Sequence, residues 1–159
     1  MIYQFYQRRV FPHLLNQVMQ TASLMDKRRE LLLPIEGEVL EIGFGTGLNI
    51  PFYGNVDVLY ALEPNPDIYH LAVERVQHAP FHVKHVQAHA EKLPFADQSL
   101  DHVVSTWTLC SIARLDQALA EIYRVLKPTG TLHLVEHVKH PNSVKIQSLQ
   151  TLLTPIQKR

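Results

Sequence analysis

The feature that most constrains the fold is a run of alternating glycines directly after a short apolar segment. Residues 39–43 are Val-Leu-Glu-Ile-Gly, and glycine recurs at positions 45 and 47. Because glycine adopts positive φ angles without a steric penalty, this pattern predicts a strand that ends in a sharp turn, where the backbone can approach a ligand closely. Strand and helix patterns alternate along the rest of the chain, which predicts right-handed β-α-β units and a parallel sheet with helices on both faces.

We therefore expect an α/β fold with a Rossmann-like, doubly wound, mostly parallel sheet. The 159 residues suit a single domain. We divide it into an N-terminal helical cap (1–36), a core (37–140) and a C-terminal segment (141–159). Strands are expected at 39–43, 56–62, 81–88, 101–106 and 131–138. Helices are expected at 12–30, 46–53, 66–76, 115–126 and 143–153. Ligands of such sheets bind beyond the carboxyl ends of the strands, so functional residues should directly follow the strands.

The charge balance argues against nucleic acid as a partner. Lys plus Arg and Asp plus Glu both number 15, and a duplex-DNA binder usually needs a basic face. A single cysteine excludes an internal disulfide framework and suits a reducing, cytoplasmic setting. No signal-peptide pattern is present, and no apolar run approaches the ~20 residues of a transmembrane segment. A net charge of zero favours association, so we expect a homo-oligomer.

Two carboxylates indicate which nucleoside the glycine turn would hold. Glu41 lies two residues before Gly43, where it would repel a pyrophosphate but favour a cationic ligand. Glu63 follows Gly43 by twenty positions, at the end of the second predicted strand, where an acid can accept both hydroxyls of a ribose. The dinucleotide pattern G-x-G-x-x-G would need glycine at position 48, which is Leu. The turn therefore predicts S-adenosyl-L-methionine as cofactor, and the predicted helix after it presents an N-terminus suited to the methionine carboxylate.

Loops after the third and fourth predicted strands complete the expected site. The backbone of 89–95 could meet the adenine ring, or this loop could be a plain connection. Trp107 could line the site or belong to the core. The expected cofactor-binding residues are Glu41, Gly43, Phe44, Gly45, Asn49, Glu63, Pro64, Asn65, Ala90, Glu91, Thr106 and Trp107.

Over about residues 30–140 the chain resembles the class I S-adenosylmethionine-dependent methyltransferases. The resemblance is carried by an ordered set of motifs: Glu41-x-Gly43-x-Gly45-Thr46-Gly47, Glu63-Pro64, Ala90-Glu91-x-Leu93-Pro94-Phe95, Asp101 and Leu126-Lys127-Pro128-x-Gly130. Within the class the chain resembles the methyltransferase-like branch of animal thiol S-methyltransferases, with ubiquinone/menaquinone C-methyltransferases slightly further off. This resemblance implies S-adenosyl-L-methionine as methyl donor and a small-molecule acceptor, such as a thiol, a quinol or a lipid-like compound.

The chain departs from the family pattern in two places. Many relatives carry Asp at the position of His89, where it accepts from the adenine amino group. Members of this fold also continue past the fifth strand into an antiparallel hairpin, and we expect this hairpin to be missing from the sequence that ends at Arg159. We expect the open edge of the fifth strand to contact another molecule or the terminal helix.

The catalytic chemistry stays open at this stage. A thiolate acceptor needs little beyond alignment, whereas a hydroxyl or carbon acid needs a general base. His137 is the first candidate for that base, followed by Glu136 and Cys110. Ten histidines are present, but their spacing does not predict a metal site. A cofactor-binding protein without activity, because of the short C-terminus, is the alternative, and a nicotinamide oxidoreductase is a third.

Overall fold

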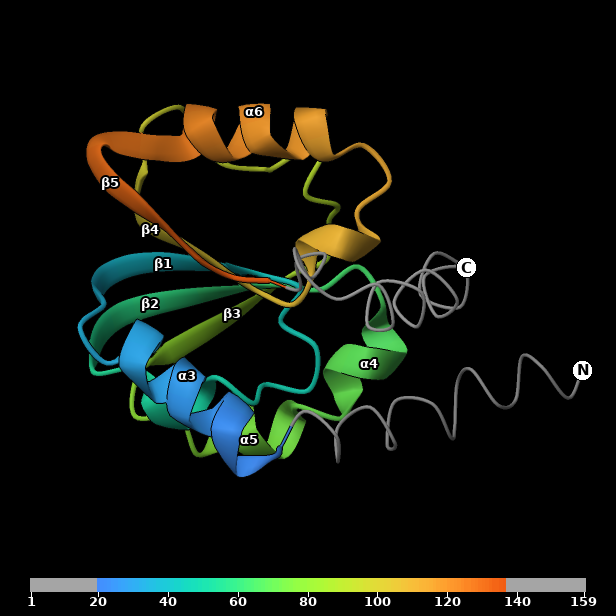
Figure 1. Ribbon diagram of the computed structural model, residues 1–159. Helices are drawn as coiled ribbons and strands as arrows, with labels where there is room; N and C mark the ends of the chain where they lie inside the picture. The colour runs from blue at the N-terminus through green and yellow to red at the C-terminus, as the bar shows by residue number, and fades with distance from the viewer. Residues whose placement is uncertain (1–19, 137–159) are drawn as a thin grey trace, which may run out of the picture.

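The computed structural model describes residues 20–136, which form a parallel sheet with helices on both faces (Figure 1). The strand order is β3-β2-β1-β4-β5, and every neighbouring pair is parallel. The strands are β1 (Glu36–Ile42), β2 (Asn55–Leu62), β3 (His82–Val86), β4 (Leu100–Thr106) and β5 (Leu126–Val135). The order reverses between β1 and β4, so the ligand crevice of such a sheet is expected beyond the carboxyl ends of these two strands. The predicted fold class is confirmed.

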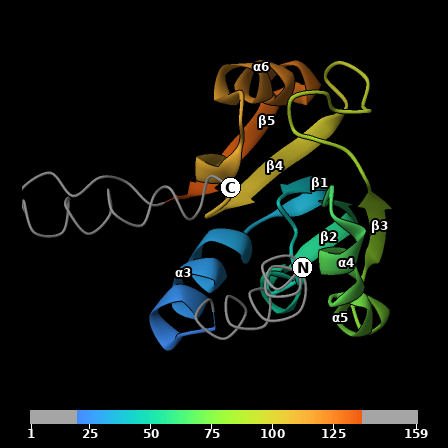
Figure 2. The same ribbon diagram turned by 90° about the vertical axis from the view of Figure 1, so that its right-hand side faces the viewer.

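Helix α6 covers one face of the sheet, and α3, α4 and α5 lie on the other (Figures 1 and 2). The helical elements are α3 (Ala22–Leu32), η2 (Ile50–Phe52), α4 (Pro66–His70), α5 (Val73–Gln77), η3 (Leu109–Ser111) and α6 (Leu115–Val125). Side chains of β1 alternate between two cores: Val39 packs in the core on the α3 side and Leu40 in the core that contains Ala118 of α6. The central strand is therefore buried on both faces, as parallel sheets require. No helix among residues 20–136 is long and apolar enough to cross a membrane.

The helix predicted at 46–53 is wrong. Only the three-residue 3-10 helix Ile50–Phe52 forms there. Gly47 has a φ of +74°, and Pro51 lacks the N–H that an α-helix would use, so the segment cannot continue as regular helix. The helix predicted at 66–76 is interrupted at residues 71–72 and forms α4 and α5 instead.

Strand β5 begins five residues earlier than predicted, at Leu126 rather than 131. The register jumps from Leu100↔Leu126 to His102↔Thr131, so residues 127–130 lie opposite the single residue Asp101. The Asp101 carboxylate accepts from Lys127 Nζ at 2.7 Å and from the Glu38 N–H at 3.0 Å. This irregular segment lets Pro128 stay in a strand that, within residues 20–136, has a partner on one side only.

Several predictions on the chain ends lie outside the described residues. They are the first part of the helix at 12–30, the end of the strand at 131–138, the helix at 143–153, the missing hairpin and the contact of the open edge. The division into cap, core and C-terminal segment stays a prediction.

Candidate cofactor site

The glycine turn at the end of β1 has the conformation that its sequence predicts. Gly43, Gly45 and Gly47 have φ angles of +70°, +59° and +74°. A Cβ on Gly43 would overlap the Thr108 side chain, and a Cβ on Gly47 would come within 3.2–3.3 Å of Phe44, Ala72 and Ile50. A Cβ on Gly45 would meet only the Gly43 carbonyl oxygen, at 3.8 Å. The open side of the turn is therefore at Gly45, where a Cβ would take up the room of a ligand.

Glu63, directly after β2, is joined to this turn. One carboxylate oxygen accepts from the Gly45 N–H at 3.1 Å, and the other accepts from the Asn65 N–H at 3.0 Å. The side chain is buried, and this burial raises the pKa of Glu63, although the two backbone donors and nearby His85 oppose the shift. Each oxygen keeps a lone pair beyond its single backbone donor, which suits the two hydroxyls of a ribose. Asn65 caps α4 by accepting from the Asp67 N–H at 2.9 Å.

Glu41 is buried at the end of β1 and is bonded to the segment that follows the glycine turn. Its carboxylate accepts from Asn49 Nδ2 at 2.9 Å and from the Tyr53 hydroxyl at 2.7 Å. Asn49 Nδ2 also donates to Thr106 Oγ1 at 3.1 Å, so three of the expected site residues form one buried network. Burial raises the pKa of Glu41 to about 7, although the hydrogen bonds from Tyr53 and Asn49 and the charge of Arg28 lower it.

Tyr53 belongs to this network and Arg28 lies beside it, although neither was among the expected cofactor-binding residues. Arg28 is only 3% exposed, and its guanidinium carbon lies 4.5 Å from the centroid of the Trp107 ring. Burial lowers the pKa of Arg28, while Glu41 opposes this shift. A signal for Arg28 existed, because it follows Met25 by three positions and precedes Leu32 by four, and so continues the apolar periodicity of its helix.

Trp107 follows β4 with a φ of +54°, which is an uncommon conformation for a residue other than glycine. Its backbone N–H donates to the Val135 carbonyl at 2.7 Å. The ring is partly buried against Arg28, so it lies at the boundary between the core and the site. Phe44, in contrast, is buried in the core with its ring 5.9 Å from that of Tyr69.

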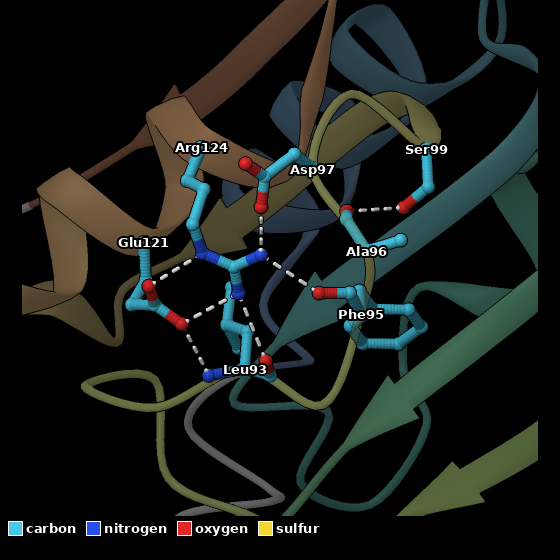
Figure 3. Close-up of polar contacts among 7 residues, drawn as sticks. All are labelled: Leu93, Phe95, Ala96, Asp97, Ser99, Glu121 and Arg124. Carbon is cyan, nitrogen blue, oxygen red and sulfur yellow. Dashed lines mark hydrogen bonds and ion pairs between the residues drawn. The ribbon is translucent and has the colours of Figure 1, made fainter.

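The loop expected to meet the adenine ring is fixed by one arginine of α6 (Figure 3). Arg124 donates to the carbonyls of Leu93 and Phe95 at 3.0 and 2.8 Å, and pairs with the carboxylates of Glu121 and Asp97, both at 2.7 Å. Glu121 in turn accepts from the Leu93 N–H at 2.8 Å. The hydrogen bonds from Arg124 lower the pKa of Glu121 to about 2, so this clasp is ionised at neutral pH.

The start of the same loop lies against the ends of β1 and β2. Ala90 is buried in the core that includes Ile42 and Leu62, the last residues of those strands. Glu91 accepts from the Arg114 N–H at 3.3 Å, and His89 is exposed. Ala90 and the glycine turn are therefore at the same edge of the sheet.

The candidates for a general base differ in their surroundings. Glu136 follows β5, and its Oε1 accepts from Ser105 Oγ and from the N–H groups of Thr108 and Leu109, each at 3.0 Å. Its Oε2 is buried without a hydrogen-bond partner among the described residues. Burial raises the pKa of Cys110, and nearby Glu136 raises it further, which disfavours a thiolate there. His137 lies outside the described residues.

His85 and His133 each contact another ring. His85 stacks on Tyr69 with ring centroids 3.6 Å apart, and His133 Nε2 lies 3.1 Å from His102 Nδ1 across β4 and β5. Within residues 20–136, no group of three or more His, Cys, Asp or Glu side chains could hold a metal ion.

The fold and the site define a class of protein. Residues 40–134 match the family described as the methyltransferase domain. The chain belongs to this family, the class I S-adenosyl-L-methionine-dependent methyltransferases. The residues present fit the cofactor of this class, because Glu63 offers acceptors for the ribose and Gly45 leaves room beside it.

The chain is also similar to individual methyltransferases. Thiol S-methyltransferase TMT1B of Rattus norvegicus is 32% identical over 162 residues, covering 93% of this chain and 66% of the relative. The ubiquinone/menaquinone biosynthesis C-methyltransferase UbiE of Haemophilus ducreyi is 47% identical over 57 residues, covering 36% of this chain and 22% of the relative. A solved SAM-dependent methyltransferase from Thermotoga maritima has a TM-score of 0.68 and 25% identity, covering 99% of this chain and 72% of that one. The chain spans less than two thirds of the length of either curated relative.

Proposed function

We propose that the protein transfers the methyl group of S-adenosyl-L-methionine to a small-molecule acceptor. The observation that carries this proposal is the hydrogen bond from the Gly45 N–H to the buried Glu63 carboxylate. Glu63 lies directly beside Gly45, the glycine of the turn with open space in front of it, and this supports a role for its carboxylate in accepting ribose hydroxyls. A dinucleotide would instead require a turn suited to a pyrophosphate, and the buried Glu41 disfavours one.

When bound, the cofactor supplies a methyl group that its sulfonium charge has already activated. The chain's own residues then need to bind, align and exclude water. Glu63 would hold the ribose, and the backbone near Ala90 would meet the adenine ring. The network of Glu41, Asn49 and Thr106 would border the methionyl part. Phe44 would contribute through its backbone, because its side chain is in the core.

We infer that a thiol is the first acceptor to test. The support is the similarity to thiol S-methyltransferases, which extends over 93% of this chain, whereas the similarity to UbiE extends over 36%. Thiols also ionise near neutral pH, so the reaction needs little help from a base. For a quinol or another carbon acid, Glu136 is the candidate base among the described residues, because its Oε2 is buried without a partner there. A cytoplasmic setting and a homo-oligomer stay predictions.

The experiment that tests the proposal has two parts. Calorimetric titration with S-adenosylhomocysteine and with NAD separates a methyltransferase site from a dinucleotide site, and binding of NAD alone would refute the proposal. Transfer of a radiolabelled methyl group is then measured on a panel of small thiols and quinols. Tight S-adenosylhomocysteine binding without transfer to any acceptor would favour the cofactor-binding protein without activity.

A further inference from the structure

Arg28 carries a buried charge and has no role in the function proposed above. The residue is 3% exposed, and its Nε and Nη1 atoms are buried without a hydrogen-bond partner among the described residues. A guanidinium in such surroundings is costly unless an anion pairs with it. The guanidinium carbon lies 4.5 Å from the centroid of the Trp107 indole, a cation–π contact that holds the group against the ring. Two nitrogens of the guanidinium therefore lack a hydrogen-bond acceptor among the described residues.

The network also contains a buried hydrogen-bond acceptor that lacks a donor among the described residues. Asn49 Oδ1 is a buried acceptor without a partner among residues 20–136, while its Nδ2 donates to Glu41 and Thr106. Arg28 interacts electrostatically with the same Glu41. Unpaired donors and an unpaired acceptor therefore flank one buried carboxylate. A ligand that satisfies both carries an anion for Arg28 and a hydrogen-bond donor for Asn49 Oδ1, and an α-amino acid has both groups.

The structure lacks the helix N-terminus that the sequence predicted as a binding site for the methionine carboxylate. The predicted helix at 46–53 would have presented its N-terminus to the ligand, but only the three-residue Ile50–Phe52 helix forms. A helix this short has little dipole to offer. Among the described residues of this network, Arg28 carries a positive charge that is available for a carboxylate.

We propose that Arg28 binds the α-carboxylate of the methionyl part of S-adenosyl-L-methionine, and that Asn49 Oδ1 accepts from its ammonium group. This inference rests on the proposed function and adds a residue from outside the family motifs. The planar fork of an arginine suits a carboxylate better than a lysine would. Arg28 also selects the intact cofactor over nucleosides that lack the carboxylate.

The test is calorimetric titration of the full chain with two ligands that differ only in the carboxylate, S-adenosylhomocysteine and its decarboxylated analogue. We expect Arg28→Gln to weaken S-adenosylhomocysteine binding by about 30-fold or more, the usual cost of removing one partner of a buried charge pair. Binding of the decarboxylated analogue should change by less than about threefold. The matched control is Arg29→Gln, because Arg29 lies on the same helix with a side chain that is 66% exposed. The control should bind both ligands as the wild type does.

Equal losses for the two ligands in Arg28→Gln would overturn the inference and leave Arg28 as a packing residue. The wild type provides a measurement that does not depend on a variant that folds. It should prefer S-adenosylhomocysteine over the decarboxylated analogue by about 30-fold, and equal affinities would also overturn the inference. A wild type that binds neither ligand would refute the proposed function itself, which is a different result from equal binding of both.

Discussion

The buried Glu41 predicts an unusual dependence of stability on pH. The pKa of Glu41 is about 7 in the folded protein, whereas the ordinary value for a glutamate is 4.5. The pKa is raised because burial disfavours the charged form. Between these pH values the folded protein keeps a proton that the unfolded chain releases. The stability that Glu41 contributes is therefore present below pH 4.5 and is lost as the pH rises through about 7. The pKa difference corresponds to a loss of about 3 kcal/mol in the free energy of unfolding.

The perturbation that isolates this effect is Glu41→Gln. Glutamine can still accept from Asn49 and contact Tyr53, but it does not titrate. Urea unfolding of both proteins would be followed between pH 5 and 8 by the fluorescence of Trp107, the single tryptophan of the chain. We expect the free energy of unfolding of the wild type, relative to Glu41→Gln, to fall by about 2–3 kcal/mol over this range.

Other titrating groups contribute equally to the free energy of unfolding of the wild type and of Glu41→Gln. Burial, together with nearby His102, lowers the pKa of His133, so that histidine contributes stability that increases with pH. It does so in both proteins and cancels in the difference. Parallel pH profiles, within about 0.5 kcal/mol, would refute the argument that burial sets the ionisation of Glu41.

Three further predictions concern the turn, the ribose acid and the arginine clasp. Gly45→Ala should lower the free energy of unfolding by only about 1–2 kcal/mol, the backbone cost of positive φ, yet abolish S-adenosylhomocysteine binding in calorimetry. Gly47→Ala, which crowds the core, should lower the melting temperature more than Gly45→Ala does, and identical behaviour of the two would contradict the assignment. Glu63→Ala should weaken S-adenosylhomocysteine binding by about 1–3 kcal/mol, whereas Ala at the exposed Glu74 should not, and unchanged affinity in Glu63→Ala would exclude the ribose role. Arg124→Leu should cost about 1 kcal/mol of stability, because its side chain is 31% exposed, and should speed hydrogen exchange in the loop before β4, while unchanged exchange would mean that the clasp does not fix this loop.

The sequence predicted the sheet well because its strands are short apolar runs between clear turn signals. It also predicted that Glu63 and the glycine turn follow strand ends, and in the structure a hydrogen bond joins the two. The helix at 46–53 was wrong because Pro51 and the positive φ of Gly47 outweighed the helical pattern. On α6, Ala118 and Ile122 are buried, whereas Leu119 is 41% exposed.

The residues that the sequence did not identify depend on contacts between distant segments. Tyr53 and Arg28 reach Glu41 from different elements, and an arginine on an amphipathic helix usually faces solvent. The charge of Arg28 is buried because α3 packs beside the site. Asn49 was expected at the site, but its simultaneous bonds to Glu41 and Thr106 required the pairing of β1 with β4.

The bond between the Gly45 N–H and Glu63 makes the loop and its acid a single preassembled unit. A nucleoside that arrives there does not have to order either part, so less of its contact energy is lost to freezing the protein. The same bond couples the two positions energetically. Gly45→Ala would keep the N–H donor but fill the space beside it, and Glu63→Ala would remove the acceptor. Because both changes act on one unit, their effects on nucleoside binding should not simply add.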